Sequence, residues 1–270
     1  MDSTGLLDIA VIDGKGPRVL DLPSLMLVAA AGFIGGAMNA LAGGGSFATL
    51  PALLAVGLPA NIANATSNFA LLPGAAMSTW SFRDELGPVG GVNLRVLGWV
   101  TFFAGLVGSA LLVLTPARTF DLIVPWLVLY AFVVLTVGKR ASTWLAQRVT
   151  IGACTLIFVQ VLLGIYGGYF GGGVGLMMTA TYGLLAGLHP RAMFAPRTLM
   201  LTIANAAAAI VFVAAGMIDW QSCVPMLVGG IVGGWAGAIV GKRLPHGLVR
   251  WWTLLVSGAT TAVFFWRAYG

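Results

Sequence analysis

Residues 41–59 read LAGGGSFATLPALLAVGLP, and residues 169–190 read YFGGGVGLMMTATYGLLAGLHP. In both stretches a glycine triplet interrupts a long apolar run, and a shorter apolar segment follows it. Inside a bilayer each unsatisfied backbone group costs several kcal/mol, so broken backbone persists only where protein buries it or where it lines a cavity. The two triplets therefore predict two interrupted helices, with the other segments packed around them.

The composition indicates a polytopic membrane protein. Of 270 residues, 59% are hydrophobic and only 8% are charged, whereas a soluble domain carries about 25% charged residues. The mean hydropathy is +0.97. Because apolar runs continue from near residue 22 to residue 267, we expect a single membrane domain over residues 1–270, with no room for a soluble catalytic domain.

The net charge of +6 does not indicate a nucleic-acid partner. The basic residues lie in short loops between apolar runs, as the positive-inside rule describes, and the expected surroundings are a lipid bilayer. Residues 1–21 lack a basic region followed by an apolar core, so we expect a surface tail there instead of a cleavable signal peptide.

Ten apolar segments follow one another along the chain. A helix needs about 20 apolar residues to cross a membrane, so the two short segments after the triplets are expected to be half-helices or re-entrant segments. This predicts an all-α protein with about 8 to 10 membrane segments. The segments are 23–42, 46–58, 61–81, 93–114, 119–138, 150–170, 174–188, 192–216, 221–241 and 248–267.

The two halves of the chain align with each other. Besides the glycine breaks, FAGLVGSALLVLTP at 103–116 matches VGGWAGAIVGKRLP at 232–245. We therefore predict repeat one over about 22–138 and repeat two over about 150–267, joined by a loop at about 139–149. The glycines at helical spacing in 103–116 and 232–245 are expected to let helices pack closely.

The charges predict that the second repeat is inverted. If each half crosses the membrane an odd number of times, most basic residues lie on one side, which makes the 139–149 loop cytoplasmic and the termini external. Inverted repeats with interrupted helices are typical of secondary transporters, whose substrate site lies at the repeat interface.

These motifs resemble the sulfite exporter TauE/SafE family of membrane permeases. The GGGS and GGGV breaks precede ATSN at 65–68 and APRT at 195–198, and AAGMIDW at 214–220 resembles that family's second-repeat loop. The resemblance implies transport of sulfite, organosulfonates or related small anions across the bacterial inner membrane. The sequence departs from the pattern at Ala195-Pro196-Arg197, which adds a positive charge and makes the two half-sites unequal.

Arg197 is the foremost candidate for binding the anion. It lies several residues inside the segment at 192–216, and ionisable residues inside a membrane usually face a cavity or a partner. Its planar fork can hold two oxygens of a sulfite, sulfonate or carboxylate. The alternative is that Arg197 extends outward to the cytoplasmic interface.

Backbone amides at the two breaks form the second candidate element. The N-terminus of a short helix offers free N–H donors and the positive end of its dipole to an oxyanion. Ser46 is expected to cap the first short helix or to donate to the anion. The alternative is that the triplets are only tight packing turns. The candidates are Gly43, Gly44, Gly45, Ser46, Gly171, Gly172 and Gly173.

A polar cluster forms the third candidate element. Neutral Asn, Ser and Thr side chains can donate hydrogen bonds to an oxyanion, although they can equally hold helices together. The cluster comprises Asn61, Asn64, Thr66, Ser67 and Asn68, of which we select Asn64, Ser67 and Asn68, together with Asn39 and Asn205.

Carboxylates and histidines are rare inside the predicted segments, and this argues against an enzyme or a proton pump. All eight carboxylates fall in the tail or at segment ends, and both histidines, His189 and His246, adjoin prolines in predicted loops. We therefore expect no catalytic residues, no metal site, no cofactor and no proton relay.

The predicted function is a permease for a small anion, most specifically sulfite, an organosulfonate or a related sulfur oxyanion. A negative cell interior favours export, because each negative charge gains about 2.3 kcal/mol per 100 mV on leaving. The alternatives are a permease for another small solute such as a carboxylate, or a non-transport membrane subunit. The small-residue segments also permit a homodimer.

Overall fold

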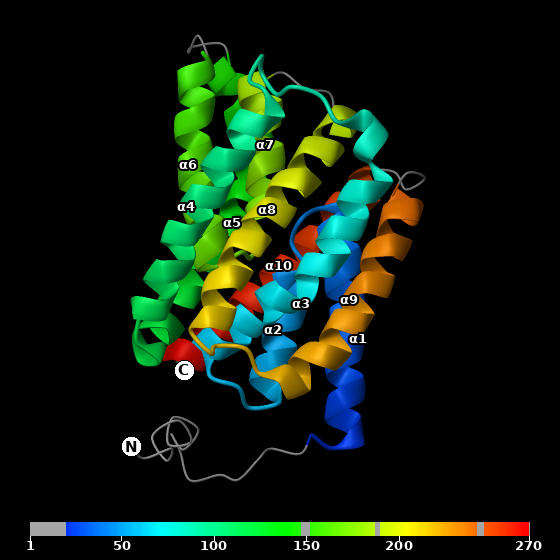
Figure 1. The fold of residues 1–270 in the computed structure, drawn as a ribbon, viewed down its shortest axis with the longest axis vertical. Coiled ribbons are helices and arrows are strands. Elements are labelled where there is room, and N and C mark those ends of the chain that lie inside the picture. The colour runs from blue at the N-terminus through cyan, green and yellow to red at the C-terminus, as the bar shows by residue number, and fades with distance from the viewer. Residues whose placement is uncertain (1–19, 147–151, 187–189, 242–245, 270) are drawn as a thin grey trace, which may run out of the picture.

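The computed structural model describes residues 20–146, 152–186, 190–241 and 246–269, and within these ranges the protein is all-helical (Figure 1). Two short 3-10 helices, η2 (Arg83–Glu85) and η3 (Pro190–Met193), accompany ten α-helices. The α-helices are α1 (Leu22–Leu41), α2 (Ser46–Ala55), α3 (Ala60–Ser81), α4 (Leu94–Leu114), α5 (Ala117–Ala146), α6 (Ala153–Tyr169), α7 (Val174–Ala186), α8 (Phe194–Ala214), α9 (Trp220–Gly241) and α10 (His246–Tyr269).

Five of these helices are long and apolar enough to cross a membrane: α1, α4, the Ala117–Val134 part of α5, α8 and α9. The helices α2 and α7 have 10 and 13 residues. At 1.5 Å per residue they are about 15 and 20 Å long, which is too short for a hydrocarbon core of about 30 Å. The prediction that these segments are short helices following each break is confirmed.

The loop predicted over residues 139–149 is wrong for most of its length. Helix α5 continues through Lys139 and Arg140 to Ala146, a total of 30 residues. Residues 139–146 contain neither glycine nor proline, so nothing in their sequence ends the helix. At about 45 Å, α5 is longer than the hydrocarbon core of a bilayer is thick. Residues 147–149 lie outside the described residues.

The ten helices contact one another in corresponding pairs. In these pairs, α1–α5 of the first half correspond in order to α6–α10 of the second half. Helix α1 packs along α9, and its counterpart α6 packs along α4. Helix α3 contacts α9, and its counterpart α8 contacts α4. Helix α5 contacts α7 as α10 contacts α2, while α3 packs on α8 and α5 on α10. In Figure 1, α1, α3 and α5 run upward, whereas α6, α8 and α10 run downward.

Glycine allows the closest of these helix pairs to form. A Cβ atom on Gly32 or Gly36 of α1 would collide with the backbone of α9, and one on Gly108 of α4 would collide with the carbonyl of Ile165 in α6. Gly105 and Gly237 likewise face neighbouring helices at close range. The packing role predicted for the glycines of 103–116 and 232–245 is confirmed for Gly105, Gly108 and Gly237, and Gly32 and Gly36 have the same role.

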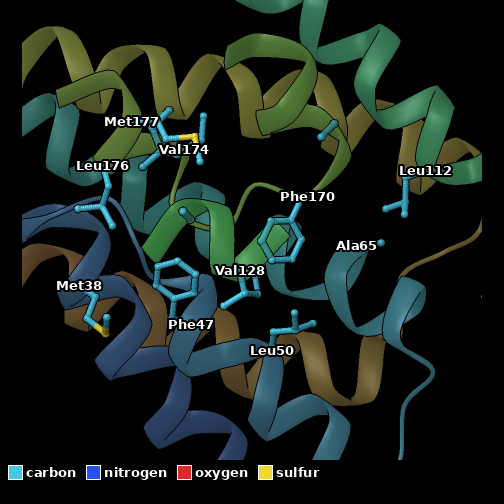
Figure 2. Packing of buried hydrophobic residues seen from close by; sticks show 14 of the residues in the cluster. Met38, Phe47, Leu50, Ala65, Leu112, Val128, Phe170, Val174, Leu176 and Met177 are labelled. Atoms are coloured by element: carbon cyan, nitrogen blue, oxygen red, sulfur yellow. The ribbon is translucent and has the colours of Figure 1, made fainter. Parts of the chain in front are cut away.

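The buried apolar core joins both breaks. Figure 2 shows Phe47 and Leu50 of α2 beside Val128 of α5 and Phe170, with Val174 of α7 close by. Phe47 and Phe170 are among the largest fully buried side chains. The two short helices are therefore held in the centre of the protein by one continuous cluster.

Replacing Gly108 with alanine is expected to destabilise the α4–α6 pair, because the added methyl group meets backbone that cannot move aside. Overpacking of this kind typically costs about 1–3 kcal/mol. Thermal unfolding of the purified protein in detergent measures the effect. Gly87→Ala is the control, since a Cβ at Gly87 meets nothing within 4 Å. Equal melting temperatures for the two variants would contradict the packing role of Gly108.

Candidate functional site

The two interrupted helices end in the same way. The amide of Gly43 donates to Met38 O at 2.9 Å, and the amide of Gly171 donates to Tyr166 O at 3.3 Å, each five residues back. Gly43 and Gly171 have φ values of 84° and 72°, in the left-handed region that favours glycine. In both halves of the chain, glycine therefore ends the helix and turns the backbone toward the short helix that follows.

The two breaks lie in direct contact. A Cβ on Gly43 would come within 2.5 Å of the Cα of Gly175, and a Cβ on Gly173 within 2.9 Å of the Phe47 ring. Gly44 and Gly172 are also buried. The interpretation of the triplets as tight packing turns is thus confirmed for their geometry, while a role in binding anions remains a prediction.

Asn39 organises the first break. Its Oδ1 accepts a hydrogen bond of 2.7 Å from the amide of Gly45, and the side chain is buried. Gly45 is the N-cap residue of α2, and no side chain caps this helix. The expectation that Ser46 caps α2 is therefore wrong. Ser46 is the first helical residue, and Asn39 of α1 already binds the amide of the N-cap residue.

Arg197 points into the protein. Its side chain is only 2% exposed. Nη2 donates to Ala40 O at 2.6 Å and Nη1 to Leu41 O at 3.3 Å, so the guanidinium binds the last carbonyls of α1. The guanidinium carbon lies 4.7 Å from the centre of the Phe194 ring. The alternative that Arg197 extends outward to the membrane interface is wrong.

Two features of Arg197 are unusual for a buried cation. The Nε atom is buried and has no hydrogen-bond partner. Among the described residues, the ion pair present is Arg83 with Asp84, at 3.8 Å on the surface, so no carboxylate there pairs with Arg197. The charge is offset only in part, by the negative end of the α1 dipole, which is equivalent to about half an elementary charge.

Asn64 makes the reciprocal contact at the other break. Its Nδ2 donates to Tyr169 O, the last residue of α6, at 3.1 Å. Arg197 belongs to the second half of the chain and binds the end of α1, whereas Asn64 belongs to the first half and binds the end of α6. Each half thus supplies a donor to the interrupted helix of the other half.

The rest of the predicted polar cluster is buried in α3, except for Asn61. Ser67 Oγ lies 2.6 Å from Thr49 Oγ1 of α2, and Thr66 Oγ1 accepts from the amide of Asp219 at 3.0 Å. Asn61 is half-buried, and its Oδ1 accepts from the neighbouring amide of Ile62.

Asn68 and Asn205 are each 4% exposed. Asn68 lies against the second break, because a Cβ on Gly171 would come within 2.9 Å of its Nδ2 atom. The structure brings Asn68 to Gly171 and Asn39 to Gly45, and it places Asn205 on the same helix as Arg197. The three asparagines are thus distributed over both breaks and α8.

A second buried polar network was not predicted from the sequence. Gln160 of α6 donates from Nε2 to Thr101 Oγ1 at 2.7 Å, and its Oε1 accepts from the hydroxyl of Tyr182 at 3.1 Å. Thr101 in turn donates to Leu97 O at 2.7 Å. The available signal was a lone glutamine within an apolar helix, which must find partners where no water is present.

Among the described residues, no group of three or more His, Cys, Asp or Glu side chains is arranged to hold a metal ion. The prediction that His246 lies in a loop is wrong, because His246 is the first residue of α10. His189 is outside the described residues. The buried polar groups at the breaks are amides, hydroxyls and one guanidinium. Such groups bind and orient a solute, and they offer no nucleophile–base pair.

Several apolar helices, two interrupted helices and a buried polar centre define a multi-pass membrane protein. The sequence matches the profile of sulfite exporter TauE/SafE over residues 28–264, so the chain belongs to that family.

Relatives with similar sequences carry transporter names. A "Probable membrane transporter protein" from Haemophilus influenzae is 29% identical over 243 residues, covering 88% of this chain and 93% of that protein. "Probable membrane transporter protein YfcA" from Escherichia coli K12 is 25% identical, covering 88% of each chain. "Probable membrane transporter protein ORF9" from Sinorhizobium sp. is 29% identical, covering 79% of this chain and 80% of that protein.

Replacing Asn39 with alanine is expected to destabilise the first break by about 1–3 kcal/mol, because it leaves the buried amide of Gly45 without an acceptor. Thermal unfolding of the purified protein measures the loss. Asn61→Ala is the matched control, since Asn61 is half-buried and bonds only its neighbour. If Asn39→Ala unfolds at the same temperature as Asn61→Ala, Asn39 does not hold the break.

Proposed function

We propose that this membrane transporter carries a small anion, most specifically sulfite, an organosulfonate or a related sulfur oxyanion, and that Arg197 binds it. The observation that carries the proposal is the buried guanidinium of Arg197, which has no carboxylate partner among the described residues. Removing a charge from water costs several kcal/mol unless it is paired. An anionic substrate would supply the missing partner during transport.

The remaining donors of Arg197 suit an oxyanion. A guanidinium has five N–H groups, and the carbonyls of Ala40 and Leu41 accept from two different nitrogens. The Nε–H stays unpartnered. Nε–H and a neighbouring Nη–H form one side of the planar fork, which matches two oxygens of a sulfite, sulfonate or carboxylate. The anion can therefore bind while the end of α1 remains held.

We infer that the two halves are inverted repeats, about 22–138 and 150–267, with the substrate site where their breaks meet. The paired helix contacts and the opposite directions of α1, α3, α5 and α6, α8, α10 support this inference (Figure 1). In such transporters the substrate lies between interrupted helices at the repeat interface.

The other proposed contacts follow from their position around this site. We place Asn205 beside the anion as a neutral donor, and Asn64, Ser67 and Asn68 on the opposing half. The amides of Gly44, Gly172 and Gly173 are further donors once the breaks move apart, whereas those of Gly43, Gly45 and Gly171 already bind Met38 O, Asn39 Oδ1 and Tyr166 O and border the same site. We place Ser46, the residue after Gly45, beside the anion at the first break.

A carboxylate permease is the second candidate function, because the same fork of Arg197 accepts a carboxylate. The family membership favours the sulfur oxyanion. We place the protein in the bacterial inner membrane, with the end of α5 on the cytoplasmic side, as the basic residues there favour. A homodimer is compatible with its exposed apolar helices.

Arg197→Gln is expected to lose anion binding at least about tenfold, which corresponds to about 1.4 kcal/mol. Sulfite, methanesulfonate and acetate are titrated into the purified protein, with thermal stabilisation as the measurement. Arg197→Lys keeps the charge without the planar fork, so its binding is expected to be intermediate. The control is Arg95→Gln, at an exposed position at the start of α4. Unchanged affinity in Arg197→Gln would move the anion elsewhere.

Export is expected to respond to the membrane potential, because a monovalent anion gains about 2.3 kcal/mol per 100 mV on leaving a negative interior. Proteoliposomes loaded with the bound anion and polarised with a potassium ionophore report its efflux. A negative interior should speed efflux, and a positive interior should slow it. Efflux that is equal at both polarities would rule out potential-driven movement of a net charge.

A further inference from the structure

A groove runs between α4 and α8 on the apolar surface of the protein. Its volume is about 460 Å³, and its walls are almost entirely apolar. On α4, Arg95, Trp99 and Phe102 are spaced i, i+4 and i+7, so they lie on one face of the helix. On α8, Leu199 and Ile203 are spaced i and i+4 and form the opposite wall. Both helices are long and apolar enough to cross a membrane, so the groove lies beside lipid.

Gly98 leaves room in this groove. It is buried, and a Cβ there would come within 3.2 Å of Ile203 Cδ1, so a larger side chain at this position would displace Ile203 or enter the groove. Without a side chain, the backbone of α4 is open to close approach by an apolar chain. Trp99 is 63% exposed and forms the outer edge of the groove. These features match an extended acyl chain.

A more polar hollow adjoins the groove at the start of α4. It has a volume of about 360 Å³ and is lined by the loop before α4, including Pro88 and Asn93. Leu94 lines both the groove and the hollow, so the two spaces are neighbours. Arg95, the next residue, is exposed and is the charged residue among those that line them. Within the described part of the chain, no carboxylate forms an ion pair with Arg95.

We propose that one anionic phospholipid occupies both spaces, with its phosphate on Arg95 and an acyl chain in the groove between α4 and α8. The planar fork of a guanidinium matches two phosphate oxygens. The polar hollow takes the rest of the headgroup. A free phosphate ion would leave the groove unused, and a helix from a second copy of the chain would leave Arg95 without an anion. A phospholipid satisfies both parts.

The position of the groove along α4 agrees with this assignment. Arg95 is in the first turn of α4, and α4 begins at the top of Figure 1, the end at which α5 finishes. The orientation proposed above makes this the cytoplasmic side, where basic pockets between membrane helices bind anionic headgroups. Tryptophan at the position of Trp99, one turn further in, is typical of the membrane interface. The lipid site itself requires neither that orientation nor an anionic substrate.

Thermal unfolding of the full-length protein, purified free of lipid in detergent, tests the site. Phosphatidylglycerol and phosphatidylcholine with identical acyl chains are added at increasing mole fractions in the micelle. Phosphatidylglycerol is expected to raise the melting temperature by about 2–4 °C in a saturable manner. Phosphatidylcholine, which has no net charge, should need at least about a tenfold higher mole fraction. Glycerol phosphate has the phosphate without acyl chains and should cause no shift.

Two variants separate the headgroup contact from the chain contact. Arg95→Gln should raise the mole fraction of phosphatidylglycerol for half of the shift at least about tenfold, close to that of phosphatidylcholine. The matched control is Arg83→Gln, which removes an exposed arginine from η2, between α3 and α4, and should change nothing. Gly98→Leu fills the groove and should weaken the response to both lipids. If Gly98→Leu does not fold, Arg95→Gln still provides the readout.

Three results would overturn the proposal. Equal responses to the two lipids would indicate only a general belt of lipid, and an unchanged response in Arg95→Gln would remove the phosphate from Arg95. A dimer in detergent that Gly98→Leu dissociates, without any response to phosphatidylglycerol, would assign the groove to a second copy. Because Arg95→Gln retains Arg197, its response to sulfite is expected to persist, so failure of the lipid site is distinguishable from failure of the anion site.

Discussion

The structure depends on satisfying the backbone where two helices stop inside the protein. A helix end leaves four carbonyls without partners in its own helix, and a bilayer provides no water to bind them. Here each end is met by a donor from the other half of the chain: Arg197 at α1 and Asn64 at α6. The breaks are therefore stable only when the two halves are assembled.

This reciprocity also explains why glycine is needed in several distinct places. Gly43 and Gly171 supply left-handed turns, whereas Gly108 supplies close helix contact with no special backbone angle. Where Gly43 meets Gly175, the backbones of the two halves touch without side chains between them. The substrate site that we propose at this contact would open by movement of one half relative to the other, with few side chains rearranging.

The two helix ends at the breaks meet partners of unequal charge, a cation at α1 and a neutral amide at α6. Arg197 is held by carbonyls, and a carbonyl is a weaker partner for a guanidinium than a carboxylate is. The α6 end has only neutral partners from α3. A protein that needed rigidity alone would not bury a cation in this way, since an apolar side chain of similar volume usually serves stability as well or better. The solute-binding role that we propose for Arg197 would account for that cost.

Much of the fold could be predicted from local features. The apolar runs located all ten helices, and the triplets located both breaks, because hydrophobicity and the conformational freedom of glycine act at the positions that carry them. The basic residues after Val137 favour a loop, which is wrong for α5 because nothing in residues 139–146 stops a helix. The position of Ser46 favours a capping role, whereas Asn39, six residues before Gly45, already binds the amide of Gly45.

The sequence by itself determined that this is a membrane protein with two broken helices, and it identified Arg197 and the asparagines as the polar groups to place. Only the tertiary structure decided what those groups bind. Arg197 meets Leu41 across 156 residues, and Asn64 meets Tyr169 across 105. The partner of a buried donor depends on which distant segment the packing brings beside it, and no local pattern in the sequence records that.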